Sequence, residues 1–274
     1  MTSDVSLTST PGGSSESSLL VASDVYKSFN GVVAVDGMDL SVERGQMAGL
    51  IGPNGAGKST MFDLISGLTT PDRGSIVFDG TEITRKTPWH IAQLGLVRSF
   101  QIARELKQMT VMENVMLAGQ HQPGEAFWRA VLPGVRSQVI DQEIELRDHA
   151  WEILDFFELD HLAGEYAGNL SGGQRKLLEL ARVLMTEPTM ILLDEPFAGV
   201  NPTLEEKLLG RLHALQAEGY TILLVEHDME VIMNHCEPIT VMHQGQRLLE
   251  GDPQTVQDDE RVLEAYLGAE VWAE

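Results

Sequence analysis

Residues 52–59 limit the possible folds of this chain more than any other segment. They read GPNGAGKS, which fits the phosphate-binding pattern G-x-x-x-x-G-K-[ST]. The glycines let consecutive backbone N–H groups curl around phosphate oxygens without side-chain collisions. An apolar run at residues 46–51 precedes the loop, and residues 61–68 have the apolar spacing of a helix. The sequence therefore predicts a strand, a phosphate-binding loop and a helix in succession.

The predicted loop supplies the groups that a nucleoside triphosphate requires. Lys58 is expected to face the β and γ phosphates, and Ser59 to offer its hydroxyl to Mg²⁺. The helix that follows points its positive N-terminal end at the anion. The alternative, an ordinary glycine-rich turn, is disfavoured by this context. The residues predicted to bind the nucleotide here are Gly52, Pro53, Asn54, Gly55, Ala56, Gly57, Lys58, Ser59 and Thr60.

Two apolar runs further along the chain end in polar residues. Asp194 closes the first run, and its carboxylate is predicted to be a partner of Mg²⁺. Glu195 follows it, in a position to polarise a water for attack on the γ-phosphate. His227 ends the second run and is expected to touch the γ-phosphate or to orient that water. Taken alone, an Asp-Glu-Pro segment is more often a strand end, and a lone His is more often structural.

Gln101 follows a possible short strand in the segment VRSFQ. It is expected to reach the metal ion or the attacking water, although a single Gln says little on its own. The predicted metal ligands are therefore Ser59, Gln101 and Asp194, and the predicted catalytic residues are Glu195, His227 and Gln101.

A second anion-binding segment lies at residues 170–174, which read LSGGQ and precede a helical pattern. Ser171 is predicted to be the N-cap of that helix, which leaves the N-terminal amides available to an anion. The alternative is a capped helix without a ligand. Two anion-binding sites in one chain favour two copies that pair head to tail and share each nucleotide. The nucleotide-binding residues predicted in this segment are Ser171, Gly172, Gly173 and Gln174.

The remaining pattern divides the chain into a body and two tails. Residues 1–18 are rich in Ser, Thr and Gly and are predicted to be disordered, and residues 269–274 form a second tail. Short apolar runs within residues 19–79 predict strands, and residues 172–225 alternate helices with buried strands, as in a parallel sheet. Between them, residues 100–170 or thereabouts are predicted to form an inserted helical subdomain.

Composition limits the partners and the compartment. The 41 Asp and Glu residues exceed the 19 Lys and Arg residues and give a net charge of -22, which argues against a nucleic-acid partner. Cys236 is the only cysteine, so no intramolecular disulfide can form. The start of the chain lacks the apolar core of a secretory signal, and no apolar run is long enough to span a membrane. We expect a cytoplasmic protein that docks on a membrane without crossing it.

With these motifs, the chain resembles the nucleotide-binding subunits of ATP-binding cassette (ABC) transporters over residues 19–268. GPNGAGKST is similar to their Walker A motif, Gln101 to their Q-loop glutamine and LSGGQ to their signature. ILLDE is similar to Walker B with its catalytic glutamate, and His227 to the switch histidine. The resemblance implies an α/β fold, a P-loop NTPase core with a mixed sheet, an antiparallel β subdomain and the helical subdomain. It also implies ATP and Mg²⁺ as ligands, with Phe29 rather than Tyr26 stacking on the adenine.

The resemblance also implies partners. ATP would be sandwiched between Walker A of one ATPase subunit and the LSGGQ segment of a second, in a homodimer or a heterodimer. Two integral membrane permease subunits would bind the ATPases at the inner face of the cell membrane, through a groove near residues 101–119. An extracytoplasmic solute-binding protein would act with the complex indirectly, and no nucleic acid is expected.

Less specific segments narrow the function. PFAGVNP, VRSFQ, MTVMENV, VEHDM and VLEAYLG are similar to cassettes that drive uptake of branched-chain amino acids, commonly the larger of two paired ATPases. Asn201 stands where many cassettes have an aspartate, which would alter contacts across the dimer. The resemblance predicts the ATP-hydrolysing subunit of an importer for branched-chain or related amino acids.

Several alternatives remain. They are cassettes for urea or amide uptake, for lipopolysaccharide export, or without a transport role on ribosomes or DNA. The last group usually has tandem cassettes or a long coiled-coil insertion, and this chain has neither. A kinase or GTPase is disfavoured because LSGGQ and His227 have no role there.

Overall fold

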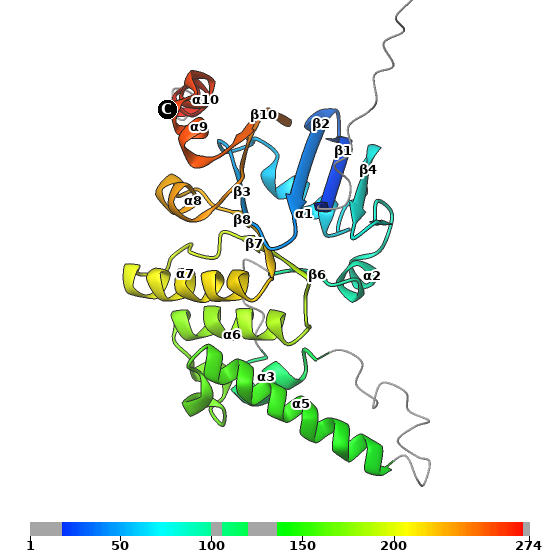
Figure 1. Cartoon of the computed structure of the whole chain (residues 1–274), viewed down its shortest axis with the longest axis vertical. Coiled ribbons are helices and arrows are strands. Elements are labelled where there is room, and N and C mark those ends of the chain that lie inside the picture. The colour runs from blue at the N-terminus through cyan, green and yellow to red at the C-terminus, as the bar shows by residue number, and fades with distance from the viewer. Residues whose placement is uncertain (1–17, 100–105, 120–135, 271–274) are drawn as a thin grey trace, which may run out of the picture.

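The computed structural model describes residues 18–99, 106–119 and 136–270. These residues form two β-sheets and a layer of helices that follow one another along the long axis of the molecule (Figure 1). The predicted tails lie mostly outside the described residues. Ser18 belongs to the first strand, and the last helix continues to Glu270.

The larger sheet has six strands in the order β10-β9-β3-β8-β7-β6. Its neighbouring strands pair in parallel, except for β9 and β10, which pair antiparallel. The strands β3, β7 and β8 are buried along their whole length, as expected for parallel strands that are covered on both faces. The strands are β3 (Met47–Ile51), β6 (Leu96–Arg98), β7 (Met190–Asp194), β8 (Thr221–Val225), β9 (Ile239–His243) and β10 (Gln246–Gly251).

The second sheet is antiparallel, with its strands in the order β2-β1-β4-β5. Helix α1 (Lys58–Ile65) packs between the two sheets, because one buried apolar cluster joins Phe62 of α1 to Leu20 of the smaller sheet and Leu192 of the larger one. The phosphate-loop segment that precedes α1 is therefore anchored by both sheets. The strands are β1 (Ser18–Phe29), β2 (Val32–Glu43), β4 (Arg73–Phe78) and β5 (Thr81–Glu82).

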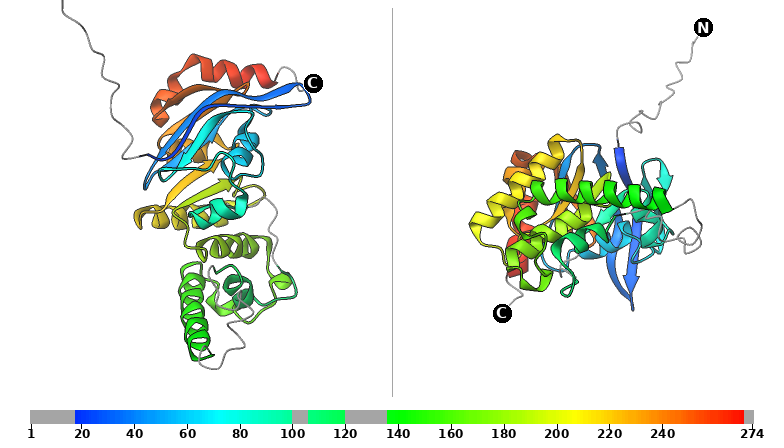
Figure 2. Two further views of the ribbon diagram at one scale, coloured as in Figure 1. Left: turned by 90° about the vertical axis from the view of Figure 1, so that its right-hand side faces the viewer. Right: turned by 90° about the horizontal axis from the view of Figure 1, so that it is seen from below.

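Helices cover the other face of the larger sheet and form a second apolar core. This core runs from Leu193 of β7 through Leu212 of α7 and Leu178 of α6 to Leu154 of α5 and Val115 of α3. The helices α3 and α5 lie at the opposite end of the molecule from β1 and β2 (Figure 2). The helices are α2 (Pro88–Gln93), α3 (Val111–Met116), α5 (Arg136–Phe156), α6 (Gly172–Leu184), α7 (Pro202–Ala217), α8 (Met229–His235), α9 (Pro253–Asp258) and α10 (Glu260–Glu270), with short 3-10 turns η2 (Asp160–Leu162) and η3 (Ala167–Asn169).

The predicted mixed sheet, antiparallel sheet and helical segment are all present in the structure. One boundary differs, because the helix predicted at residues 61–68 begins at Lys58 and ends at Ile65. Apolar periodicity reports only the buried face of a helix, and the first turn of α1 is polar. Within the described part of the chain, no helix combines the length and the apolar character that crossing a membrane requires.

Candidate functional site

The phosphate loop predicted at residues 52–59 connects β3 to α1. Gly52, Gly55 and Gly57 have φ angles of 151°, 80° and 104°, in the left-handed region that favours glycine. A Cβ atom on Gly52 would lie 2.0 Å from the carbonyl oxygen of Met242, and one on Gly57 would lie 2.3 Å from that of Ala34. The loop is therefore held tightly between β9 and β2, and only glycine fits at these two positions.

Lys58 is buried in the first turn of α1, and its ammonium remains within the loop. Its Nζ donates hydrogen bonds to the carbonyl oxygens of Gly52, at 2.6 Å, and Pro53, at 3.1 Å. Burial lowers the pKa of Lys58, and the nearby carboxylates of Glu195 and Asp194 oppose that shift. A positive charge held by backbone carbonyls beside two carboxylates is suited to a phosphate group with a divalent cation.

Asp194 ends β7, and its carboxylate is almost completely buried. Arg98 of β6 donates to Asp194 Oδ2 at 2.6 Å and, through its other terminal nitrogen, to Asp63 Oδ1 of α1 at 2.5 Å. Asp194 Oδ1 is also buried, and it has no hydrogen-bond partner among the described residues. A buried carboxylate oxygen without a partner is costly unless a ligand or water satisfies it, so Asp194 fits the predicted role of a Mg²⁺ partner.

Ser59 follows Lys58 in α1 and is exposed. It lies one helical turn before Asp63, so Ser59 and Asp63 share a face of α1, and Arg98 links Asp63 to Asp194. Hydroxyl and carboxylate oxygens are ligands that Mg²⁺ accepts. The third predicted ligand, Gln101, lies outside the described residues.

Glu195 and His227 meet at the ends of neighbouring strands. Asp194 of β7 pairs with Val225 of β8 in parallel register, so the residues that follow each strand emerge at the same edge of the sheet. Glu195 has a φ angle of 48°, and its backbone N–H donates to the carbonyl oxygen of Val225 at 2.9 Å. The Nε2 atom of His227 lies 2.6 Å from Glu195 Oε1. This arrangement brings two of the three predicted catalytic residues into direct contact.

The sequence analysis did not identify Glu226, which organises the same edge. Its carboxylate is buried and accepts hydrogen bonds from the backbone N–H of Phe197, at 2.9 Å, and from that of His227, at 3.1 Å. Burial raises the pKa of Glu226, and the two N–H donors oppose that shift. Glu226 therefore ties the segment after Glu195 to the segment that carries His227. An acidic residue at the end of an apolar strand is the sequence signal that could have indicated it.

Arg98 was also missed, although it lies in the segment VRSFQ that was quoted for Gln101. Its side chain is only 13% exposed and is paired with two carboxylates from different elements. A basic residue in a short strand was the available signal. Its two partners are 35 and 96 residues away in the chain, so the local sequence does not indicate them.

The LSGGQ segment forms the predicted cap of α6. Ser171 Oγ accepts a hydrogen bond from the Gln174 N–H at 3.3 Å, and Gln174 Oε1 accepts one from the Ser171 N–H at 2.9 Å. In the described part of the chain, no hydrogen bond joins this segment to the phosphate loop. A Cβ atom on Gly173 would lie 2.3 Å from Leu204 Cδ2, so this glycine allows α6 to approach α7 closely, while Gly172 has open space around it.

The two aromatic candidates for adenine stacking differ in their surroundings. Phe29, at the end of β1, is 45% exposed, with Lys27 Nζ 5.3 Å from its ring centroid. The Tyr26 ring is covered by the guanidinium of Arg73, at 4.9 Å, and its hydroxyl lies against Gly37. The structure therefore leaves Phe29 the more accessible ring.

Asn201, the residue that departs from the common pattern, begins α7. Its Oδ1 accepts a hydrogen bond from the Leu204 N–H at 3.0 Å, which makes Asn201 the N-cap of the helix. An aspartate would cap this helix equally well.

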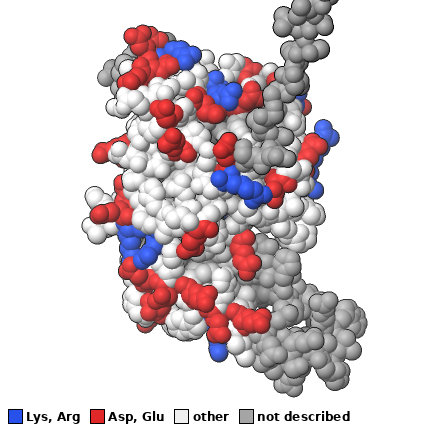
Figure 3. All heavy atoms as spheres, viewed as in Figure 1, with Lys and Arg blue, Asp and Glu red and all other residues white. Residues whose placement is uncertain are grey.

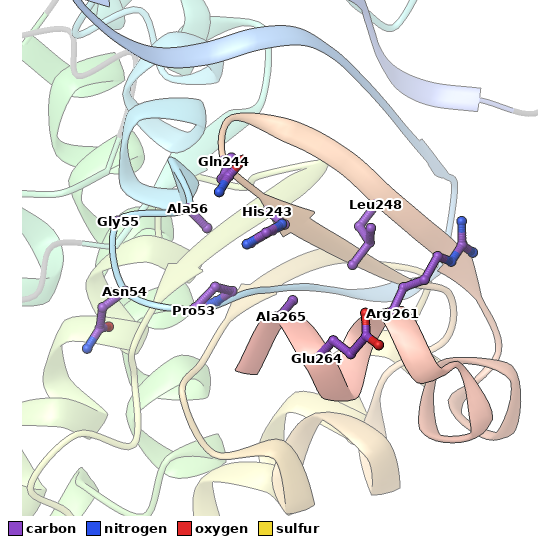
Figure 4. A pocket seen from close by; sticks show the side chains of 10 residues that line it. All are labelled: Pro53, Asn54, Gly55, Ala56, His243, Gln244, Leu248, Arg261, Glu264 and Ala265. Atoms are coloured by element: carbon purple, nitrogen blue, oxygen red, sulfur yellow. The ribbon is translucent and has the colours of Figure 1, made fainter. Parts of the chain in front are cut away.

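A cavity of about 600 Å³ lies beside the phosphate loop (Figure 4). Residues 53–56 form one wall, and the turn between β9 and β10 and the helix α10 form the others. Lys58, Asp194 and Glu195 do not line it, so this cavity is separate from the carboxylates described above. The sequence analysis did not anticipate it, because α10 is more than 190 residues from the loop in the chain.

Two family models match the chain. The model described as ABC transporter matches residues 35–198. The model described as branched-chain amino acid ATP-binding cassette transporter matches residues 246–271, which include the whole of β10, α9 and α10.

Similar proteins and structures agree with these models. A probable branched-chain amino acid transport ATP-binding protein, LivG, of Archaeoglobus fulgidus is 38% identical and covers 92% of this chain and 96% of its own. The high-affinity branched-chain amino acid transport ATP-binding protein BraF of Pseudomonas aeruginosa is 38% identical, over 91% of this chain and 98% of its own. The crystal structure of the ADP conformation of an ATP-binding cassette of an ABC transporter has a TM-score of 0.79 and 37% identity, covering 92% and 99%. The crystal structure of a nucleotide-free ATP-binding cassette from an ABC transporter has a TM-score of 0.77 and 37% identity, over 90% of this chain and 98% of its own.

Proposed function

Because the chain belongs to the ATP-binding cassette family of ABC transporters, we propose that it is the ATP-hydrolysing subunit of an importer for branched-chain or related amino acids. ATPase activity follows from the family. The substrate class rests on the names of the relatives and on the branched-chain family model that matches residues 246–271.

The contact between Glu195 and His227 is the observation that supports hydrolysis most directly. A carboxylate that acts as a general base must lie within hydrogen-bond reach of the water from which it takes a proton. In our proposal, Glu195 polarises the attacking water and His227, 2.6 Å away, holds the Glu195 carboxylate. Lys58 binds the β and γ phosphates, and Phe29 stacks on the adenine.

Magnesium completes this proposed site. Ser59, Asp194 and Gln101 would hold the ion, which neutralises charge on the β and γ phosphate oxygens when it is bound. The unpartnered Oδ1 of Asp194 supports its assignment as a ligand. The other oxygen, Oδ2, accepts a hydrogen bond from Arg98.

A second cassette would complete the nucleotide site. Ser171 and Gly172 of the LSGGQ segment are exposed, and no described hydrogen bond joins this segment to the phosphate loop of its own chain. We propose that Ser171, Gly172, Gly173 and Gln174 of one cassette contact the γ-phosphate held by the phosphate loop of another. The N-terminal amides of α6 supply the donors for that contact. Binding of ATP would then close the dimer, and hydrolysis would release it.

The membrane partner would dock in a groove of about 350 Å³ in the helical part of the molecule. Its walls come from the end of α2, from Gly119 after α3, from α5 and from the end of α6. His149 of α5 lines this groove, and among the described residues its Nε2 is buried without a hydrogen-bond partner. We propose that a cytoplasmic segment of a permease fills this groove at the inner face of the cell membrane and supplies the hydrogen-bond partner of His149 Nε2. Of residues 101–119, where the resemblance implied a permease groove, Gly119 lines this one.

The charge of the protein bears on the alternative of a ribosome or DNA partner. Acidic side chains are spread over the face in Figure 3, among fewer basic ones. With a net charge of -22, the chain lacks the excess positive charge that sequence-independent nucleic-acid binding needs.

The experiment that tests the assembly is extraction of the tagged protein from native membranes under mild conditions, with ATP and the Glu195→Gln variant to hold the dimer. Mass spectrometry is expected to identify two polytopic permeases and a second cassette ATPase. Recovery of ribosomal proteins or DNA without membrane proteins would contradict the transport function.

A deletion strain tests the substrate class. Uptake of labelled leucine is expected to fall in the deletion and to return with the wild-type gene but not with Glu195→Gln. Uptake of labelled urea and the amount of surface lipopolysaccharide serve as controls. If only one of these falls in the deletion strain, the amino-acid assignment is wrong and the corresponding alternative takes its place.

A further inference from the structure

Arg98 joins two carboxylates that belong to different elements of the site. Its Nη1 donates to Asp63 Oδ1 of α1 at 2.5 Å, and its Nη2 donates to Asp194 Oδ2 at the end of β7 at 2.6 Å. The carbon Cζ of its guanidinium lies 5.6 Å from the ring centroid of Phe62. Three contacts therefore fix a side chain that is only 13% exposed.

The strand register explains why Arg98 reaches this place. β6 pairs in parallel with β7, and Arg98 lies opposite Leu192, two residues before Asp194. Asp63 is on the helix that begins with Lys58 and Ser59. Arg98 thus connects the phosphate-loop helix to the carboxylate that ends β7, and a shift of either element would break one of its two bonds.

The two carboxylate oxygens of Asp194 differ in their hydrogen bonding. Oδ2 is occupied by Arg98, whereas Oδ1 is buried and has no partner among the described residues. The ammonium of Lys58 is near enough for Asp194 to affect its pKa, so Lys58 is a second cation that could attract this carboxylate. Without Arg98, nothing else described would fix the rotation of the Asp194 side chain.

We infer that Arg98 is a positioning residue that orients the Asp194 carboxylate so that Oδ1 stays available to a divalent cation bound with ATP. The inference rests on the proposed function, because Mg²⁺ and ATP are the ligands. The planar guanidinium suits this task, since its two terminal nitrogens donate to two separate carboxylates at the same time. A lysine ammonium can replace the charge but not this geometry.

Two other roles for Arg98 predict different results. A purely electrostatic role predicts that removing Arg98 strengthens Mg²⁺ binding, because a positive charge beside the site repels the ion. A purely structural role predicts that ATP binding weakens equally with and without Mg²⁺. A positioning role predicts that Mg²⁺ no longer strengthens the binding of ATP, whereas the affinity for ATP without Mg²⁺ is kept.

The test measures the dissociation constant of ATP for the purified full-length chain, by calorimetry, in EDTA and in excess Mg²⁺. The ratio of the two constants reports how much Mg²⁺ strengthens ATP binding. We expect this ratio to fall about tenfold or more in Arg98→Met, as for other residues that orient a metal ligand. Arg98→Lys and Asp63→Asn are expected to give intermediate ratios. Arg73→Met removes an exposed Arg–Asp pair that joins β4 to β1 in the antiparallel sheet, and should keep the ratio within about twofold of the wild type.

Several outcomes would overturn the inference. An unchanged or increased ratio in Arg98→Met would do so, as would an equal loss of affinity in EDTA and in Mg²⁺. If Arg98→Met does not fold, a wild-type ratio in both Arg98→Lys and Asp63→Asn has the same consequence. Failure of the wild-type chain to bind ATP at all would instead contradict the proposed function, and the inference with it.

Discussion

His227 Nε2 lies 2.6 Å from Glu195 Oε1, although the two residues are 32 positions apart in the chain. The contact arises because β7 and β8 are neighbours in the sheet and end at the same edge. The backbone N–H of Glu195 donates a hydrogen bond to the carbonyl oxygen of Val225, and the backbone N–H of His227 donates one to the carboxylate of Glu226. These bonds fix the backbone of both segments. The fold itself therefore holds the proposed general base, Glu195, in contact with its proposed supporting group, His227.

The first prediction concerns Glu195. Glu195→Gln keeps the shape of the side chain but removes the proton acceptor, so we expect hydrolysis to fall about 10²–10⁴-fold, as for loss of a general base. ATP binding should remain, and an ATP-bound dimer should accumulate on size exclusion. Phosphate release and light scattering measure both effects. Glu206→Gln, an exposed change on α7, is the matched control, and wild-type turnover in Glu195→Gln would reject Glu195 as the essential base.

The second prediction concerns Lys58, whose ammonium is held by the carbonyls of Gly52 and Pro53. Lys58→Ala removes the positive charge from the loop, and we expect ATP to bind about 10- to 100-fold more weakly, as for loss of a charge-assisted hydrogen bond. Lys207→Ala removes a surface ion pair with Glu158 and should leave the affinity unchanged. Equal ATP affinities for the two variants, measured by calorimetry, would contradict a phosphate-binding role for Lys58.

The third prediction compares two glycines of the phosphate loop. Both Gly55 and Gly57 have positive φ angles, but only at Gly57 would a Cβ atom collide, at 2.3 Å, with a carbonyl oxygen. Gly55→Ala is expected to lower the free energy of unfolding by about 1–2 kcal/mol, the cost of a left-handed backbone. Gly57→Ala adds the collision and should cost about 3 kcal/mol or more. Urea denaturation measures both, and similar losses would show that the loop does not press on β2.

The fourth prediction concerns Cys236, a buried thiol that ends α8. Burial raises its pKa from 9.0 to about 12. Because the unfolded thiol ionises at a lower pH, the folded state is favoured by this group below pH 9, and that contribution is lost as the pH rises from 9 towards 12. Wild type should therefore lose more stability than Cys236→Ala over this range.

Alkylation of Cys236 provides the second readout. The thiol is almost fully buried and protonated, so its reaction with iodoacetamide at pH 8 should proceed at the rate of unfolding. Rapid labelling of the native protein would show that Cys236 is accessible.

The fold could be predicted from local pattern and family resemblance together. The wholly buried strands β3, β7 and β8 appear in the sequence as the apolar runs MAGLI, MILL and ILLV, because parallel strands are covered on both faces. The start of α1 was placed too late, because its first turn is polar. Gln101, which completes the predicted metal and catalytic sets, lies outside the described residues, so its role remains a prediction.

The sequence by itself determined the phosphate loop, the Ser171 cap and three polar residues at or just after the ends of β7 and β8, namely Asp194, Glu195 and His227. These depend on local requirements, such as glycine at a positive φ angle or a side-chain acceptor at a helix start, which a short segment carries in full. Only the tertiary structure decided that Arg98 binds both Asp63 and Asp194 and that Glu226 bridges to Phe197. The partners in each case are far apart in the chain, and strand order together with packing around α1 brings them together, which no local spacing specifies.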